Sequence, residues 1–405
     1  MTSLRRARAG AGVWLGAGLL AGVFGACQTD SRSPSCDLQQ QVAQTGTPLT
    51  LLAGARLDRV GDSFLLMGVD GRVMRWATVD NAGQVGTEQS AMIPALVAGP
   101  WFAAAGQAAP GDTILVAYGT AASSPGMIDI QLLAVPASNA APPVTVGSVV
   151  TVPDPAALDG ASVVMGTGRL GRRAALAWSI PEKLEVHVLS LSGDGRAIGA
   201  PAVEALDATA PLVGCLSFVA GKGDLAVGYT TAISTADGDP SWTILEMRDD
   251  GSIGSSVTVG LGTADPLCPL SAASGAGYVA VWQNEIGSFI GFYDGTGHTF
   301  DSHLFAGAVT FGGADVQPPL AGVAPVAGGD FAVVLARPGA AEAWRVTPAG
   351  AVAPGTVVFP SGVGQMGEIS TVSVPGALYA TYADYTSSAT VGAAGQRFFV
   401  KITCF

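Results

Sequence analysis

The chain has 405 residues and a formal net charge of -12, and its residues are 49% apolar and 12% charged, with 56 glycines and 25 prolines. This length suits two average domains or one large all-β domain, and the charged share is about half of the usual ~25%. Many short apolar strands separated by turns fit this composition better than long helices do, and the absence of a Gly-x-y period excludes collagen.

The first 26 residues have the features of a secretion signal. Arg5, Arg6 and Arg8 form a positively charged start, and no charged residue occurs from position 9 to position 26. Removing residues 1–26 takes away three Arg and no acidic residue, which leaves 16 basic and 31 acidic side chains and a net charge of -15. Because nucleic-acid binding depends on Lys and Arg that neutralise phosphates, we expect no nucleic-acid partner.

A cysteine follows this signal directly. Residues 23–27 are Val-Phe-Gly-Ala-Cys, which resembles the lipobox of bacterial lipoproteins, whose Cys becomes the lipidated N-terminus. The resemblance implies a lipid on Cys27, a polar tether over residues 27–36 and export to the cell envelope, and Gln28 in place of Asp implies the outer membrane. Two alternatives stay open: cleavage after Ala26 without a lipid, and an uncleaved anchor helix, which the many glycines disfavour.

Two later uncharged stretches, 91–111 and 346–367, are each long enough to span a bilayer as a helix. Each holds three prolines, which argue against a helix. We therefore expect the protein to meet a membrane only through its lipid.

A pattern of about fifty residues recurs seven times along the rest of the chain. In each unit a short apolar run ends in a large side chain, and the steps between these end residues are 51, 60, 51, 53, 53 and 47. An apolar strand precedes the run, and a third strand, a tight turn rich in Asp, Asn and Gly, and a fourth strand follow it. The end residues are Met67, Tyr118, Trp178, Tyr229, Trp282, Leu335 and Tyr382.

Seven units of four short antiparallel strands resemble the seven-bladed β-propeller superfamily over residues 37–405. The resemblance implies an all-β ring of blades in a single domain, and we expect the recurring large side chains to pack between blades. It points to no subfamily. The Trp-Asp dipeptide of WD repeats and the double glycine of kelch repeats are absent, and residues 235–242 match a sialidase Asp-box only in part.

The chain ends predict how the ring closes. Residues 396–404 have the pattern of a third strand in blade 7, and no fourth strand follows them. Residues 37–46 can supply that strand in the antiparallel direction, which sets Cys36 beside Cys404. We therefore predict a disulfide between these two cysteines that closes the ring.

Cys215 and Cys268 are the remaining pair if Cys27 carries a lipid. They precede the second strands of blades 4 and 5 by similar distances, so we expect them at matching places on the innermost strands and predict a second disulfide. The alternative is two buried free thiols, because neighbouring inner strands can be too far apart for disulfide geometry.

Residues that suggest metal or acid-base chemistry fall in the turns of the repeat. One cluster lies between the third and fourth strands of its unit, and we predict a solvated turn there rather than a metal site. Residues 194–195 and 249–251 lack the spaced carboxylates of a calcium loop and fit type I turns. We predict no metal and no cofactor, because no zinc, phosphate-binding or hydrolase motif occurs. The cluster comprises Asp294, His298, Asp301 and His303.

The loops that follow the second strands are the predicted binding region. They differ in length between units and share a face with the connections between blades, while the blades form a rigid scaffold. His187, on a third strand, is expected to have a surface or interblade role. For the residues of the loops after the second strands, the alternative to ligand binding is that they only face solvent. The candidates for ligand binding are Asp237, Asp239, Trp242, Glu285, Arg337, Asp384 and Tyr385.

These observations lead to one hypothesis and two alternatives. The leading hypothesis is a monomeric envelope lipoprotein whose propeller binds a protein or a glycan and catalyses no reaction. The first alternative is a hydrolase or lyase that acts on polysaccharide with a carboxylate pair drawn from different loops. The second is a structural scaffold for an envelope complex.

Overall fold

The computed structural model divides the chain into two compact units, Met1–Ser33 and Pro34–Phe405, and it describes residues of the second unit only. The proposed signal and the lipidation site at Cys27 lie outside the described residues. The described residues are 36–44, 49, 52, 55–60, 63–94, 96–105, 113–136, 143–154, 165–170, 173–180, 184–206, 212–221, 227–231, 241–261, 269–274, 277–283, 288–293, 303–306, 309–311, 314–316, 320–337, 340–348, 352–353, 355–357, 365–385 and 396–404.

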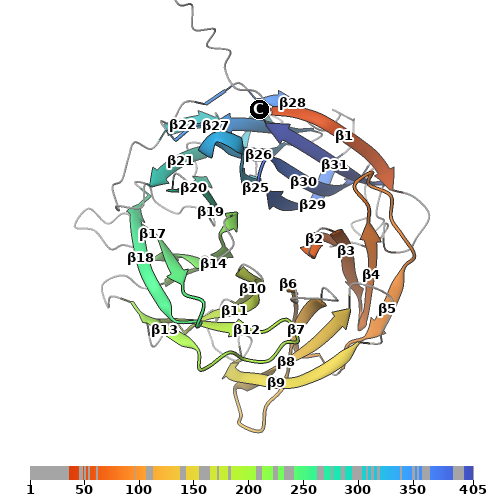
Figure 1. Cartoon of the computed structure of the whole chain (residues 1–405), viewed down its shortest axis with the longest axis vertical. Coiled ribbons are helices and arrows are strands. Elements are labelled where there is room, and N and C mark those ends of the chain that lie inside the picture. Colours follow the sequence, from red (N-terminus) through yellow and green to blue (C-terminus); the bar gives the residue numbers. More distant parts are fainter. Residues whose placement is uncertain are drawn as a thin grey trace, which may run out of the picture. The chain divides into compact units, whose positions relative to one another are not determined.

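The second unit is a seven-bladed β-propeller, as the repeat predicted. Each blade is built on four antiparallel strands, which follow one another in the sequence in blades 1–6, and Figure 1 shows the blades arranged in a ring with the first strand of each blade nearest the centre. No helix among the described residues is long and apolar enough to cross a membrane.

The first four blades follow one another along the chain. Blade 1 consists of β2 (Arg56–Val60), β3 (Ser63–Asp70), β4 (Val73–Val79) and β5 (Gln89–Met92). Blade 2 consists of β6 (Ala98–Ala105), β7 (Thr113–Ala121), β8 (Met127–Pro136) and β9 (Val144–Pro153). Blade 3 consists of β10 (Met165–Leu170), β11 (Arg173–Ile180), β12 (Glu185–Leu191) and β13 (Ala202–Ala205). Blade 4 consists of β14 (Leu212–Phe218), β16 (Val227–Thr231), β17 (Ser241–Met247) and β18 (Ile253–Gly260).

The last three blades carry the additions to the pattern. Blade 5 consists of β19 (Leu270–Ser274), β20 (Gly277–Gln283), β21 (Ser288–Tyr293) and β22 (His303–Ala306), and β15 (Ala220–Gly221) pairs with β19 in parallel. Blade 6 consists of β25 (Leu320–Pro325), β26 (Phe331–Arg337), β27 (Ala340–Val346) and β28 (Thr356–Val357), with the short helix η3 (Ala327–Gly329) between its first two strands. A small hairpin of β23 (Val309–Phe311) and β24 (Ala314–Val316) lies in the connection between these blades.

Blade 7 joins the two ends of the domain. It consists of β29 (Gln365–Val374), β30 (Ala377–Tyr385), β31 (Gln396–Cys404) and β1 (Cys36–Gln44), and β1 pairs with β31 in the antiparallel direction. The register sets Cys36 opposite Cys404, and a disulfide joins them over a Cα–Cα distance of 4.1 Å. The predicted fourth strand and the predicted disulfide are both confirmed.

The second predicted disulfide stays a prediction. Cys215 lies on β14, the innermost strand of blade 4, as expected. Cys268 lies outside the described residues, just before β19.

Side chains alternate along each second strand and so divide between the two neighbouring blades. On β20, Tyr278 and Trp282 pack in a cluster with blade 4, whereas Val279 and Val281 pack with blade 6. Strands of this kind are apolar on both faces. This packing explains why the chain holds so few charged residues.

The recurring large side chains are buried between blades, as predicted. Each packs in a core cluster with residues of the preceding blade, and none is more than 4% exposed. These residues are Tyr118, Trp178, Tyr229, Trp282, Leu335 and Tyr382.

Met67 departs from this rule, because it packs with blade 2, the blade that follows its own. The position that corresponds to Tyr118 in the strand register is Gly68, so the predicted alignment of the first unit is one residue early. A Cβ on Gly68 would lie 2.5 Å from Leu52 Cδ2. Leu52 thus fills the space that a large side chain of the second strand takes in the other blades.

Polar contacts reinforce the seam between blade 7 and blade 1. The fully buried Arg397 donates hydrogen bonds to the carbonyl oxygens of Ala55, at 3.2 Å, and Leu52, at 3.1 Å. Ser370 Oγ accepts a hydrogen bond from the backbone N–H of Leu57 at 2.9 Å. These bonds hold the segment that leads from β1 into β2 against the last blade.

The close packing between blades predicts the effect of one methyl group. A Cβ on Gly228 would overlap the indole ring of Trp242, so we expect Gly228→Ala to lower the free energy of unfolding by about 1–3 kcal/mol. Gly254, in the same blade, is the matched control, because its Cβ would meet nothing closer than 3.4 Å. Urea unfolding of both variants checks this, and equal effects of the two substitutions would contradict it.

Candidate functional site

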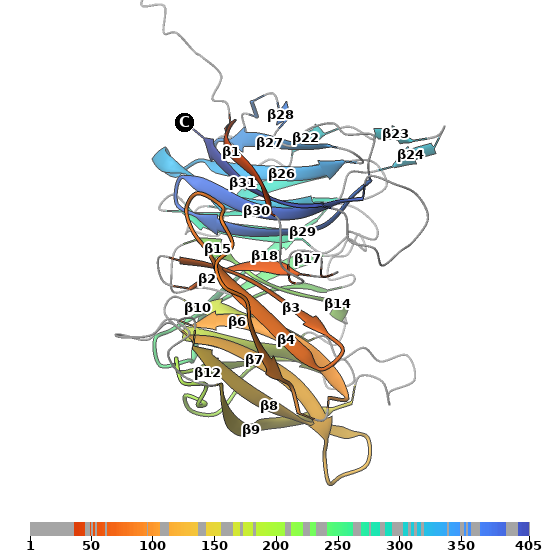
Figure 2. The same cartoon turned by 90° about the vertical axis from the view of Figure 1, so that its right-hand side faces the viewer.

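The blades present two faces that differ in their connections. Because the four strands alternate in direction, the second-to-third loops of each blade lie on the same side as the connections between blades. We name this side the loop face, and the side with the other turns the hairpin face. Figure 2 shows β23 and β24, which belong to a connection between blades, on the side opposite the C-terminal end of β31.

Three of the predicted ligand-binding residues end their strands at the loop face. Arg337 is the last residue of β26, and Asp384 and Tyr385 are the last two residues of β30. The fold therefore brings these positions, from the neighbouring blades 6 and 7, to one face. Their side chains, and the whole of Asp237, Asp239 and Glu285, lie outside the described residues, so their binding role stays a prediction.

Trp242 differs from the other candidates, because its side chain is fully buried. It is the second residue of β17, where its ring packs against Gly228, and its Nε1 donates a hydrogen bond to Ser271 Oγ of blade 5 at 2.8 Å. This position contradicts the prediction that Trp242 contacts a ligand from a loop. In the structure the indole instead links blade 4 to blade 5.

A histidine and a carboxylate form a pair near the loop-face end of β12. Glu185 and His187 are two residues apart on this strand and so point to the same side, and Glu185 Oε2 lies 2.9 Å from His187 Nε2. The imidazole stacks on Trp178, its cross-strand partner, with ring centroids 5.1 Å apart and an angle of 6° between the planes. The His187 side chain is 14% exposed, which fits the expected interblade role.

The backbone beside this pair has an unusual conformation. Leu184, directly before Glu185, has a φ of 54°, in the left-handed region that side chains other than Gly rarely adopt. Its carbonyl oxygen accepts a hydrogen bond from the backbone N–H of Leu206 at 2.7 Å. Leu184 thus connects the start of β12 to the segment after β13, directly beside the hydrogen-bonded pair.

The opposite side of blade 3 holds a second titratable pair. Glu204 pairs with Val186 across β12 and β13 and so faces blade 4, where Val186 packs with Tyr229. Burial raises the pKa of the Glu204 carboxyl, and burial, together with the charge of Glu204, raises the pKa of Tyr229 to about 12. The tyrosine therefore stays neutral at physiological pH.

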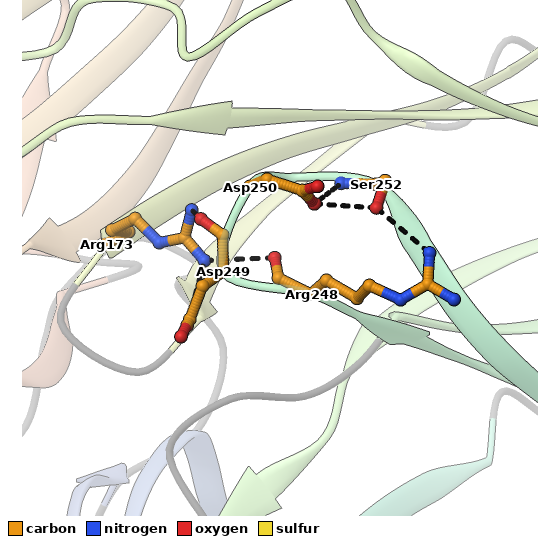
Figure 3. A network of polar contacts seen from close by, with 5 residues as sticks. All are labelled: Arg173, Arg248, Asp249, Asp250 and Ser252. Carbon is orange, nitrogen blue, oxygen red and sulfur yellow. Dashed lines mark hydrogen bonds and ion pairs between the residues drawn. The ribbon is translucent and has the colours of Figure 1, made fainter.

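The Asp-rich turns form the hydrogen bonds of ordinary turns, as predicted. Asp250 Oδ1 accepts hydrogen bonds from the backbone N–H of Ser252, at 2.9 Å, and from its hydroxyl, at 2.6 Å. Arg173 of blade 3 reaches across to this turn and donates to the carbonyl oxygens of Arg248 and Asp249, as Figure 3 shows. The turn thereby links blade 4 to blade 3 on the hairpin face.

The remaining cluster, Asp294 to His303, lies at the predicted third-to-fourth turn. His303 is the first residue of β22, and its backbone pairs with Ile290, whereas residues 294–302 lie outside the described part of the chain. Within that part, no three His, Cys, Asp or Glu side chains are grouped so that they could hold a metal ion.

Comparison with known proteins supports the fold. No family model and no curated protein matches the sequence. Among solved structures, the polysaccharide lyase Uly1 is 9% identical, with a TM-score of 0.50 over 90% of this chain and 99% of that one. A protein from Lactobacillus plantarum is 12% identical, with a TM-score of 0.48 over 87% of this chain and 99% of that one. At such low identity the likeness to Uly1 shows the fold alone.

The raised pKa of Glu204 predicts how stability changes with pH. A carboxyl whose pKa is raised on folding above its ordinary 4.5 stabilises the native state only while protonated, so the native state loses stability as pH rises through this range. We expect Glu204→Gln to gain stability relative to the wild type between pH 4 and pH 7. Urea unfolding at both pH values checks this, and a relative loss at pH 7 would contradict it.

Proposed function

We propose that this chain is an exported, lipid-anchored propeller that binds a protein or a glycan on its loop face and catalyses no reaction. The observation that carries the proposal is the convergence of strand ends on one face. Arg337 comes from blade 6, and Asp384 and Tyr385 come from blade 7, yet these strands end at the same side of the ring. Arg and Tyr are residue types that often anchor partners in binding surfaces.

The rigidity of the scaffold supports binding at this face. Clusters of buried side chains fill the seams between blades, and the Cys36–Cys404 disulfide joins the two ends of the ring. Strand ends held by such a scaffold lose little conformational entropy when they meet a partner. The disulfide also supports export, because disulfides persist mainly in oxidising compartments.

A second candidate function, an enzyme acting on polysaccharide, rests on the pair of Glu185 and His187. The pair lies at the loop-face end of β12 with a separation of 2.9 Å, which suits acid-base chemistry. Uly1, which shares the fold at 9% identity, is a polysaccharide lyase. Release of new chain ends from a polysaccharide, lost in His187→Ala, would favour this alternative over the binding module.

Binding at the loop face is tested by variants on the two faces. We expect the triple variant Arg337→Ala, Asp384→Ala and Tyr385→Ala to weaken binding about 10-fold or more to a partner captured from envelope extract. The matched control is Asp194→Ala with Arg196→Ala, an exposed pair on the hairpin face. Dissociation constants for the captured partner measure both, and unchanged affinity in the triple variant, or equal losses in both, would contradict the proposal.

A further inference from the structure

The point where the N-terminal segment enters the propeller is fixed on the hairpin face. β31 ends at Cys404, at the place where the third strand of another blade leads into a turn, as β4 does at Val79. Cys36 lies opposite Cys404, is fully buried and is held by the disulfide. The chain therefore enters β1 at this face.

The distance from the proposed lipid to this point is short. Cys27 and Cys36 are nine residues apart in the sequence, which spans about 30 Å when fully extended and about 16 Å as a flexible chain. β30, with nine residues, sets the depth of a blade at about 30 Å. If the loop face lay against the bilayer, Cys36 would stand a full blade depth above it, and the tether would have to be fully stretched.

The charges of the hairpin face do not favour adsorption to anionic lipid. Hydrogen bonds from the Ser192 and Ser252 hydroxyls lower the pKa values of Asp194 and Asp250, so both stay ionised well into acid. Of the exposed cations in these turns, Arg196 lies 3.2 Å from Asp194, and Arg248 donates hydrogen bonds to Ser252 Oγ and to the carbonyl oxygen of Gly254. Turns that carry ionised Asp, and whose Arg side chains already form contacts within the turn, gain little from anionic headgroups, which attract unpaired Lys and Arg.

We propose that the bilayer lies on the side of the hairpin face and that the loop face is presented away from it, toward a partner in the adjoining compartment. This orientation rests on the proposed lipid at Cys27. It also specifies which surface of the domain a partner can reach. The tether alone holds the hairpin face near the membrane. A protein or glycan partner therefore meets the loops without displacing lipid.

Two positions in blade 1 test this orientation with matched geometry. Ala82 and Asp70 are both exposed; Asp70 pairs with Val73 at the first end of β4 and Ala82 follows its last end, and β4 has seven residues and is about 23 Å long. In the purified lipidated full chain, p-azidophenylalanine is placed at one or the other and coupled to a donor dye. The protein is bound to phosphatidylethanolamine and phosphatidylglycerol vesicles that carry an acceptor-labelled lipid, and energy transfer is measured.

We expect energy transfer from the Ala82 position to exceed that from the Asp70 position by about twofold, given the length of β4. Equal transfer, or stronger transfer from Asp70, in protein that floats with the vesicles would overturn the orientation while the anchor stands. Cys27→Ser is the control and should not float. If Cys27→Ser floats as well as the wild type, or if neither floats, the lipid anchor fails and the orientation falls with it.

Discussion

The pairing of β1 with β31 joins two ends of the domain that are 368 residues apart in the sequence, and the other blades depend on that closure. Each seam between blades is made of side chains from both neighbours. If blade 7 lacked its fourth strand, β31 would be left as an open edge, and the contacts of Phe399 and Arg397 with blade 1 would lose their support. The disulfide holds this strand in place by a covalent bond.

The closed ring also explains why strand ends from different blades reach the same face. Strand order is the same in all seven blades, so every second strand ends at the loop face and every third strand ends at the hairpin face. Candidate binding residues far apart in the sequence reach one surface for this reason, whereas the N-terminal segment enters from the other. The proposed attachment and the proposed binding therefore lie on opposite sides of the domain.

Much of this architecture can be predicted from the sequence, because it depends on local patterns that repeat. The period of about fifty residues and the alternation of apolar residues predict the number of blades. Because no fourth strand follows Cys404, the N-terminal segment is expected to supply it, which sets Cys36 beside Cys404. The alignment of the first unit was one residue early at Met67. The sequence alone does not show that Leu52, from a connecting segment, takes the place of a large side chain beside Gly68.

The candidate site could be predicted from the sequence only in part, because it depends on contacts across strands and blades. Trp242 has the residue type of a ligand-binding aromatic, yet Gly228 on the neighbouring strand leaves room for it to lie buried. The stack of His187 on Trp178 and the electrostatic effect of Glu204 on Tyr229 follow from strand register and blade packing. The spacing of Glu185 and His187 on one strand was the local signal that could have revealed that pair.

The most direct test of closure by β1 is the equilibrium unfolding of the full chain beside the double variant Cys36→Ala and Cys404→Ala. The loop between the two cysteines spans 368 residues, so the chain-entropy model predicts a loss on the order of 5 kcal/mol in the free energy of unfolding. Wild type under reducing conditions should match the variant. An unfolding free energy within about 0.5 kcal/mol of the oxidised wild type would contradict the account, because such a change is no larger than that of an ordinary surface substitution.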